Sequence, residues 1–199
     1  MLIIQVHIEI AYPHEDETRM CGGTLIDDTR VLTAGHCFFS HGVKFSYATL
    51  TFGAHKIPVP HNGDEVIIGG VPPAEVIIHP DYHSPGLKSN DIAIVFILFE
   101  EDQEDIRNHP KISPICLPSP SPYQDLDAKF AVAVGWGKIA LQGPPSPVLL
   151  EVDLTIVSLE ECRSSYSATN FSRTFLSSVD ENIICAGRGD RRGDTCKGL

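Results

Sequence analysis

Hydrophobic and polar residues alternate along several short stretches of this chain, and a two-residue period predicts β-strands. In residues 5–10, Val6, Ile8 and Ile10 alternate with polar residues, so the strand is expected to be half buried with His7 on its polar face. Other short apolar or alternating stretches predict strands at residues 31–32, 49–52, 66–68, 74–78, 130–134, 149–157 and 182–186. Short strands separated by turns predict an all-β fold.

Three segments carry a different pattern. Residues 91–99 are continuously apolar after Asp91, which predicts a strand buried on both faces. Residues 100–105 read Glu-Glu-Asp-Gln-Glu-Asp and are expected to form a solvated acidic loop. Ser158 and Glu161 have the spacing of a capping box, which predicts a short helix through Cys162.

Prolines give the best internal boundary. They occur at positions 110, 114, 118, 120 and 122, so residues 111–122 are expected to connect two halves, residues 1–110 and 123–199. No apolar run is long enough to span a bilayer, so no membrane partner is expected.

The net charge argues against one class of partner, and the cysteine content indicates the compartment. The formal charge of −11 argues against nucleic acid as a partner, because nothing basic would neutralise phosphates. Six cysteines without CxxC metal spacing predict a disulfide framework and an oxidising compartment. Residues 1–10 lack the basic start and cleavage site of a signal peptide, which is consistent with export only if the natural N-terminus lies upstream.

The first candidate for chemistry is His36, which directly precedes Cys37. A general base must be held in one orientation, and a disulfide from Cys37 to Cys21 would fix the backbone that carries it. The alternative interpretation is a structural disulfide beside a histidine without a catalytic role. The motif alone does not decide between them.

Four blocks, in order, resemble the chymotrypsin-like (trypsin-type) serine proteases. They are residues 33–37 (TAGHC), 90–95 (NDIAIV), 135–137 (GWG) and 194–198 (DTCKG). The resemblance covers nearly the whole chain. Arthropod clip-domain proteases look similar at residues 161–163 and in keeping an unpaired cysteine at the position of Cys116. The family resemblance implies a trypsin-like double β-barrel, with a first barrel in residues 1–110, a crossover at 111–122 and an incomplete second barrel in 123–199.

The resemblance also implies roles for individual residues. His36 corresponds to the general base and Asp91 to the acid that orients it. Gly198 corresponds to an oxyanion-hole donor, and Asp194 to the carboxylate that selects arginine or lysine. The alternative for Asp194 is a charged loop residue, because it lies in an arginine- and glycine-rich run.

The family pattern pairs Cys21 with Cys37 and Cys162 with Cys185. Cys116 then corresponds to the cysteine that ties the protease to an upstream regulatory chain, and Cys196 to one that pairs nearer the C-terminus. The sequence alone also allows a bridge between Cys116 and Cys196, although the family geometry would hold them apart.

No metal or cofactor is expected. Ala54 stands where calcium-binding relatives have a glutamate. His79 and His83 have the spacing of a metal pair, but Pro80 would break a helix between them, so they are expected to be loop histidines.

The implied function is a secreted trypsin-like serine endopeptidase acting on protein or peptide substrates. The family's serine would follow Leu199, so the chain as written is expected to be truncated at both ends and inactive. Two alternatives stay open: a non-catalytic homologue that acts as a binding partner or regulator in a protease cascade, and a truncated product that does not fold stably.

Overall fold

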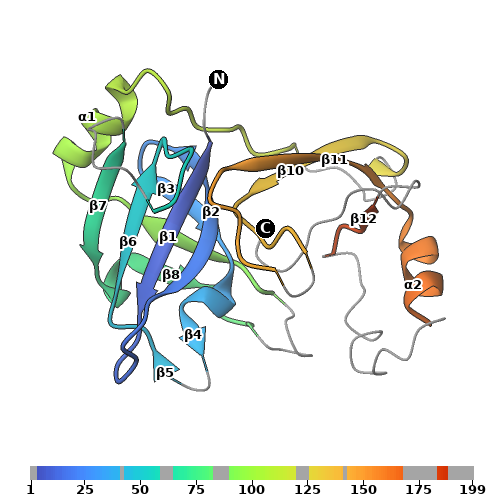
Figure 1. The fold of residues 1–199 in the computed structure, drawn as a ribbon, viewed down its shortest axis with the longest axis horizontal. Coiled ribbons are helices and arrows are strands. Elements are labelled where there is room, and N and C mark those ends of the chain that lie inside the picture. The colour runs from blue at the N-terminus through green and yellow to red at the C-terminus, as the bar shows by residue number, and fades with distance from the viewer. Residues whose placement is uncertain are drawn as a thin grey trace.

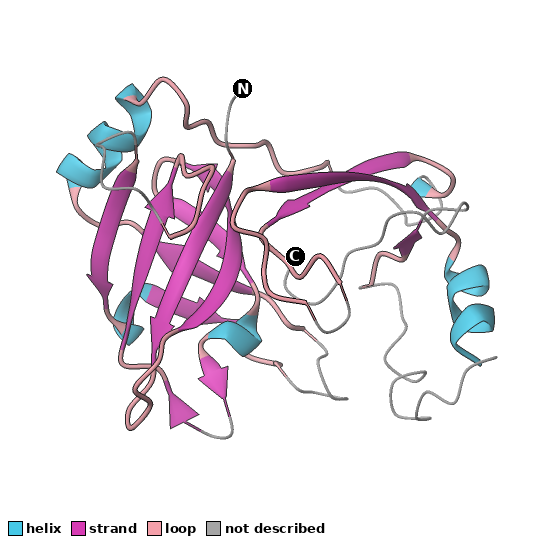
Figure 2. Cartoon of the chain, in the orientation of Figure 1, coloured by secondary structure: helices cyan, strands magenta, loops and turns pink. Residues whose placement is uncertain are grey.

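The structure is a computed structural model that describes residues 4–40, 43–58, 65–82, 90–119, 126–140, 143–167 and 183–187 (Figures 1 and 2). Strands dominate these residues, and the predicted all-β fold class is confirmed. Neither described α-helix is long and apolar enough to cross a membrane. The strands are β1 (Gln5–Ala11), β2 (Arg19–Asp27), β3 (Arg30–Thr33), β4 (Phe39–Ser40), β5 (Val43–Lys44), β6 (Tyr47–Phe52), β7 (Val66–Val71), β8 (Val76–Ile78), β9 (Ala93–Phe96), β10 (Phe130–Gly135), β11 (Leu150–Ile156) and β12 (Ala186–Gly187).

Seven strands form one antiparallel sheet in the order β7-β6-β1-β2-β3-β9-β8. Figure 1 shows this sheet curling around a common interior. That interior holds the main core, in which Val6, Ile8 and Ile10 of β1 are fully buried, as their two-residue spacing requires. Gly23 of β2 lies against this core, and a Cβ atom there would lie within 3.0 Å of Val31 and Ile8 side-chain atoms.

The second sheet contains β10, β11 and β12, in that order. Leu154 and Ile156 of β11 are buried, but Phe130 at the start of β10 is 86% exposed. The contrast with the seven-stranded sheet confirms the prediction that the second half is the less complete one.

Hydrogen bonds between residues 55–57, after β6, and residues 147–149, before β11, join the two sheets. The Leu149 N–H donates to the His55 carbonyl at 2.7 Å, and the Ile57 N–H donates to the Pro147 carbonyl at 3.0 Å. Trp136 packs with Ala54 and Ile57 in a small second core. The chain after β6 therefore contacts both ends of the connection between β10 and β11.

The predicted acidic loop is a helix, α1 (Glu100–Asn108), so that prediction was wrong. Glu100, Glu101 and Asp102 lie in its first turn, where negative charge interacts favourably with the helix dipole. Arg107 forms ion pairs with Glu100 and with Asp28. Ile106 is buried in the main core and anchors the otherwise polar helix.

Three strand predictions also need correction. Only Ala93–Phe96 of residues 91–99 is strand, and Leu98 and Phe99 are more than half exposed because the chain leaves the sheet to enter α1. In residues 74–78 the strand starts at Val76, after a 3-10 turn, η2 (Pro73–Glu75). In residues 182–186, residues 183–185 are not strand and β12 begins at Ala186, while residue 182 lies outside the described residues.

His7 was expected on the polar, solvent-facing side of β1, but this prediction was wrong. The residue is only 4% exposed. Its ring lies edge-on against Trp136, with ring centroids 5.6 Å apart. The loop after β10 therefore covers the second face of β1, a long-range contact that alternation along one strand cannot reveal.

Two disulfides are present among the described residues, Cys21–Cys37 and Cys162–Cys185. The second one holds the predicted helix, α2 (Leu159–Ser167), against the chain before β12. The Glu161 N–H donates to the Ser158 hydroxyl at 3.1 Å, which is one half of the predicted capping box. Cys116 is an exposed free thiol.

Peptide mapping without reduction tests this disulfide pattern. We expect the pairs Cys21–Cys37 and Cys162–Cys185, each worth on the order of 3 kcal/mol for a loop of this size. Cys116 is expected to react with an alkylating reagent before reduction, because its thiol is exposed. A Cys116–Cys196 peptide would contradict this assignment.

The burial of His7 predicts a pH-dependent loss of stability. Desolvation lowers the pKa of His7 below its usual 6.5, opposed by the nearby Glu9 carboxylate. Above pH 6.5 the imidazole is neutral in both states; as the pH falls below 6.5, the unfolded chain takes up a proton that the folded chain does not. Unfolding free energy should therefore fall between pH 6.5 and the lowered folded pKa, by no more than about 1.4 kcal/mol per pH unit from this group.

Denaturant unfolding of the parent chain and His7→Phe over pH 8 to 5 measures this contribution. The difference at pH 8 gives the packing change alone. The parent should then lose more stability than the variant below pH 6.5. Parallel pH profiles would contradict the prediction.

Candidate active site

His36 lies in η1 (Gly35–Cys37), a short 3-10 turn directly after β3. The turn is held from two sides. The Cys21–Cys37 disulfide ties it to β2, and the Tyr12 hydroxyl donates to the Cys37 carbonyl at 2.6 Å. Both contacts fix the backbone next to the histidine.

Asp91 is brought to the same place by the neighbouring strand. β9 pairs antiparallel with β3, and Thr33 is opposite Ala93, so the residues after β3 and before β9 emerge at the same end. Asn90 has a φ of 54°, a left-handed conformation that asparagine tolerates, and its side-chain amide donates to the Asp81 carbonyl at 3.0 Å. The backbone before Asp91 is thus held in one turn.

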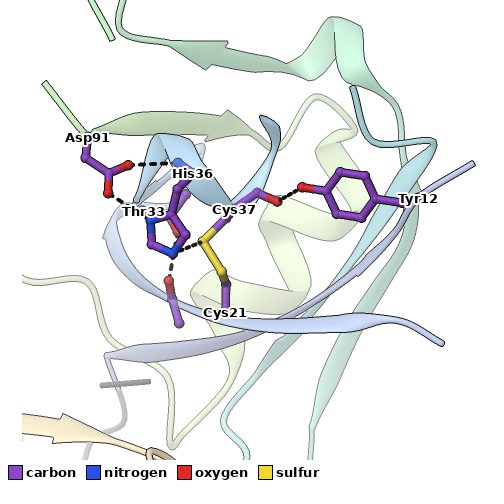
Figure 3. Close-up of polar contacts among 7 residues, drawn as sticks. Tyr12, Cys21, Thr33, His36, Cys37 and Asp91 are labelled. Atoms are coloured by element: carbon purple, nitrogen blue, oxygen red, sulfur yellow. Dashed lines mark hydrogen bonds and ion pairs between the residues drawn. A yellow bond between two sulfur atoms is a disulfide. The ribbon is translucent and has the colours of Figure 1, made fainter. Parts of the chain in front are cut away.

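The Asp91 carboxylate contacts His36 at two points (Figure 3). Oδ1 accepts a hydrogen bond from the His36 backbone N–H at 2.7 Å, and Oδ2 lies 2.8 Å from His36 Nδ1. The Asp91 side chain is 21% exposed, whereas the His36 side chain is 57% exposed. The carboxylate is therefore the inner partner and the imidazole the outer one.

This arrangement favours a role for the His36 imidazole as a proton acceptor. A carboxylate at Nδ1 favours the tautomer that carries its proton on Nδ1, which leaves the Nε2 lone pair available to accept a proton. The His36 side chain is more than half exposed, and Cys37 Sγ lies 3.9 Å from its Nε2. A histidine held in this way can act as a general base.

Tyr82 adds to the environment of the aspartate. Desolvation raises the pKa of Tyr82 to about 12, with smaller contributions from the charges of Asp91 and Tyr12. Its hydroxyl therefore stays neutral throughout the physiological range and adds no second negative charge beside Asp91. Nothing in the sequence singled out Tyr82 or Tyr12, whereas Asn90 belongs to the same block as Asp91.

The glycine before His36 lies in a confined space. A Cβ atom on Gly35 would lie 3.0 Å from Ile78 Cγ2 and 3.5 Å from Asp91 Oδ1. An alanine would therefore require a small shift of Ile78. Glycine lets the turn approach β8 and the carboxylate closely.

The described residues considered as metal ligands have other partners. Cys21, Cys37 and His36 have potential ligand atoms within 4.8 Å of one another, but both sulfurs belong to the disulfide and offer no thiolate. His79 Nδ1 instead accepts a hydrogen bond from the Asp81 backbone N–H. Ala54 is fully buried, and His83 lies outside the described residues.

The structure brings together two of the four predicted site residues, His36 and Asp91. Asp194 and Gly198 lie outside the described residues, as does Cys196. The predicted specificity pocket and oxyanion hole therefore stay predictions.

Comparison with known proteins places this geometry in a family. The profile of the Trypsin family matches residues 4–198. The chain is 32% identical over 164 residues to "Venom serine protease" of Polistes dominula, covering 80% of this chain and 54% of that protein. It is 31% identical over 188 residues to "Inactive CLIP domain-containing serine protease A8" of Anopheles gambiae, covering 91% and 46%. "Clotting factor G beta subunit" of Tachypleus tridentatus is 29% identical, covering 90% and 54%.

The fold agrees with these relatives. A solved structure described as "Structure of GrC" superposes with a TM-score of 0.69 at 27% identity, covering 98% of this chain and 74% of that chain. This likeness supports the expected trypsin-like architecture with an incomplete second barrel. The chain spans about half the length of the curated relatives it matches. With a family profile that covers nearly all of its residues, the chain belongs to the trypsin family of serine proteases.

Proposed function

We propose that this protein is a serine-type endopeptidase in which His36 is the general base and Asp91 orients it. The observation that carries the proposal is the two-point contact of the Asp91 carboxylate with the backbone N–H and Nδ1 of His36. A partly buried acid and an imidazole that it orients supply two of the three groups that nucleophilic peptide hydrolysis needs.

In the proposed reaction, His36 Nε2 takes the proton from a serine hydroxyl while the serine oxygen attacks the peptide carbonyl. Asp91 stabilises the imidazolium that forms, and the same proton then passes to the leaving amine. By the family pattern the serine belongs to the block that contains Asp194 and Gly198. The backbone N–H of Gly198 would donate to the developing oxyanion.

We further propose cleavage after arginine or lysine, with Asp194 as the carboxylate at the base of the specificity pocket. A desolvated carboxylate favours a cationic side chain, because only a paired charge offsets its burial. Its substrates would be exported proteins or peptides, since the described disulfides require an oxidising compartment.

The domain boundaries and the role of Cys116 are part of the same proposal. We place the crossover between barrels at residues 111–122; in support, residues 113–119 form neither helix nor strand. Cys116 lies in this connection as an exposed thiol, where a bond to an upstream regulatory chain would be accessible.

A second candidate is a non-catalytic homologue that regulates a protease cascade. The Anopheles gambiae relative, 31% identical, is described as inactive. Retention of both His36 and Asp91 in bonding geometry favours the enzyme, because a binding partner has no need of an oriented base.

Peptidase activity tests the proposal in a chain extended by a family C-terminal segment and given a cleaved Ile-Val-Gly-Gly N-terminus. We expect hydrolysis of arginyl and lysyl peptide esters and amides, and little hydrolysis of phenylalanyl ones. His36→Ala and Asp91→Asn should each lower kcat by about 10⁴-fold or more, the range established for this triad. The matched control is His55→Ala, an exposed histidine whose side chain lies outside the proposed machinery.

Residues 1–199 alone are expected to show no hydrolysis, because none of their serines occupies the motif position. Cleavage by residues 1–199 that is lost in His36→Ala would show that the nucleophile lies elsewhere. An extended chain that binds substrate peptides without cleaving them would instead support the non-catalytic homologue.

A further inference from the structure

The carbonyl of Cys37 is one of the groups that a short helical turn leaves without a partner inside the turn. The turn's own backbone hydrogen bonds run from the Cys37 N–H to the Ala34 carbonyl at 3.3 Å and from the Phe38 N–H to the Gly35 carbonyl at 3.1 Å. The Tyr12 hydroxyl, directly after β1, supplies the donor for the Cys37 carbonyl at 2.6 Å, and this bond is buried. The peptide group that follows Cys37 is therefore fixed from outside the turn.

This hydrogen bond restrains the turn in a way that the disulfide does not. The Cys21–Cys37 disulfide limits the distance between two Cα atoms, 6.3 Å apart, but several side-chain torsions lie between them. A hydrogen bond to a carbonyl also restrains the direction of the peptide plane. Gly35 adds little restraint of its own, because glycine has the widest choice of backbone angles. The backbone that carries His36 therefore depends on partners outside the turn.

Tyr12 is itself held by the connection between β1 and β2. Its side chain is buried, and the Arg19 guanidinium carbon lies 4.7 Å from the centroid of its ring, within the range of a cation–π interaction. Both carboxylate oxygens of Glu15 contact Arg19, at 3.0 Å and 2.6 Å. The Glu15 backbone N–H in turn donates to the Tyr12 carbonyl at 3.3 Å, so the three residues form one closed unit.

The Tyr12 hydroxyl stays a hydrogen-bond donor near neutral pH. Desolvation raises the pKa of Tyr12 above its usual 10.0, opposed by the charge of Arg19 and assisted by that of Glu15. The Cys37 carbonyl can only accept, so the bond requires the tyrosine proton. A phenylalanine would keep the aromatic ring but leave a buried carbonyl without its donor, which is unfavourable.

We propose that Tyr12 is a positioning residue for the His36 general base, and that Arg19 keeps Tyr12 in place. Figure 3 shows Asp91 and Tyr12 reaching the turn from opposite sides: Asp91 contacts His36, and Tyr12 contacts Cys37. The inference rests on the proposed peptidase function, because positioning affects catalysis only if His36 is the base. A small displacement of a reacting group lowers the rate strongly, so loss of the Tyr12 hydroxyl should lower kcat and leave KM nearly unchanged.

The tautomer of His36 gives a readout that needs no catalysis. Residues 1–199 are labelled with nitrogen-15, and two-bond correlations between ring protons and ring nitrogens are recorded at pH 9, well above the ordinary histidine pKa of about 6.5. The His36 signals are those missing from His36→Ala. We expect mainly the Nδ1–H tautomer in the parent chain and a clear shift of population towards Nε2–H in Tyr12→Phe. Tyr47→Phe, which removes the hydroxyl of an exposed tyrosine in β6, should match the parent.

Kinetics in the extended chain used for the peptidase assay measure the consequence. Tyr12→Phe should lower kcat about tenfold, with KM within about twofold of the parent. Arg19→Gln should lower kcat about two- to fivefold in the parent background and have no further effect in Tyr12→Phe, because Arg19 acts through the Tyr12 hydroxyl. Tyr47→Phe is again the matched control and should keep both constants.

Circular dichroism checks that each variant is folded. If Tyr12→Phe does not fold, Arg19→Gln, at a partly exposed side chain, is used for both measurements with the same expected directions. An unchanged tautomer or an unchanged kcat in the folded variant would overturn the proposal, and so would a parent His36 with the tautomer mixture of free histidine. An equal effect of Arg19→Gln in both backgrounds would overturn the role of Arg19.

The two proposals fail in different ways. Activity that is lost in His36→Ala but kept in full in Tyr12→Phe would remove the role of Tyr12 alone. Full activity in His36→Ala would remove the proposed function, and the role of Tyr12 with it.

Discussion

The functional part of this molecule depends on the antiparallel pairing of β3 with β9. That register places Thr33 opposite Ala93, so the turn with His36 and the turn with Asp91 meet at one end of the two strands. Because both oxygens of one carboxylate are engaged, one with the backbone and one with Nδ1, the imidazole is fixed in position as well as in tautomer. A shift of the register by one residue would turn the paired side chains to opposite faces and break both contacts.

The connection between the halves depends on a different set of contacts. The chain after β6 bonds to residues 147–149, and Trp136 packs against Ala54 and Ile57 beneath it. This arrangement covers the second face of β1, which explains why His7 is buried although it stands at a polar position of the alternation. A cavity of about 330 Å³ is lined by residues of β1 and β2 and of the chain that follows β10.

Sequence reasoning succeeded where the signal is local or where several motifs occur in a fixed order. The alternation of Val6, Ile8 and Ile10 predicted a strand, and the spacing of Ser158 and Glu161 predicted the start of α2. Sequence reasoning failed where residues distant in the sequence decide the secondary structure or the burial of a segment. Ile106 and the ion pairs of Arg107 turn an acidic run into a helix, although every residue before Ile106 in that run is polar. Tyr12, which bonds to the turn after His36, and Tyr82, whose pKa is affected by the charge of Asp91, carried no local signal at all.

One covalent bond connects β2 with the turn that holds His36. Cys21 lies in β2, while its partner Cys37 follows His36 and receives the Tyr12 hydrogen bond at its carbonyl. The disulfide holds the backbone of this turn against β2. Thr33 adds a second link to β2, because its hydroxyl donates to the Gly22 carbonyl next to Cys21 at 2.8 Å. The orientation of His36 is therefore set from two directions: by Asp91 through the imidazole and the backbone, and by β2 through the disulfide.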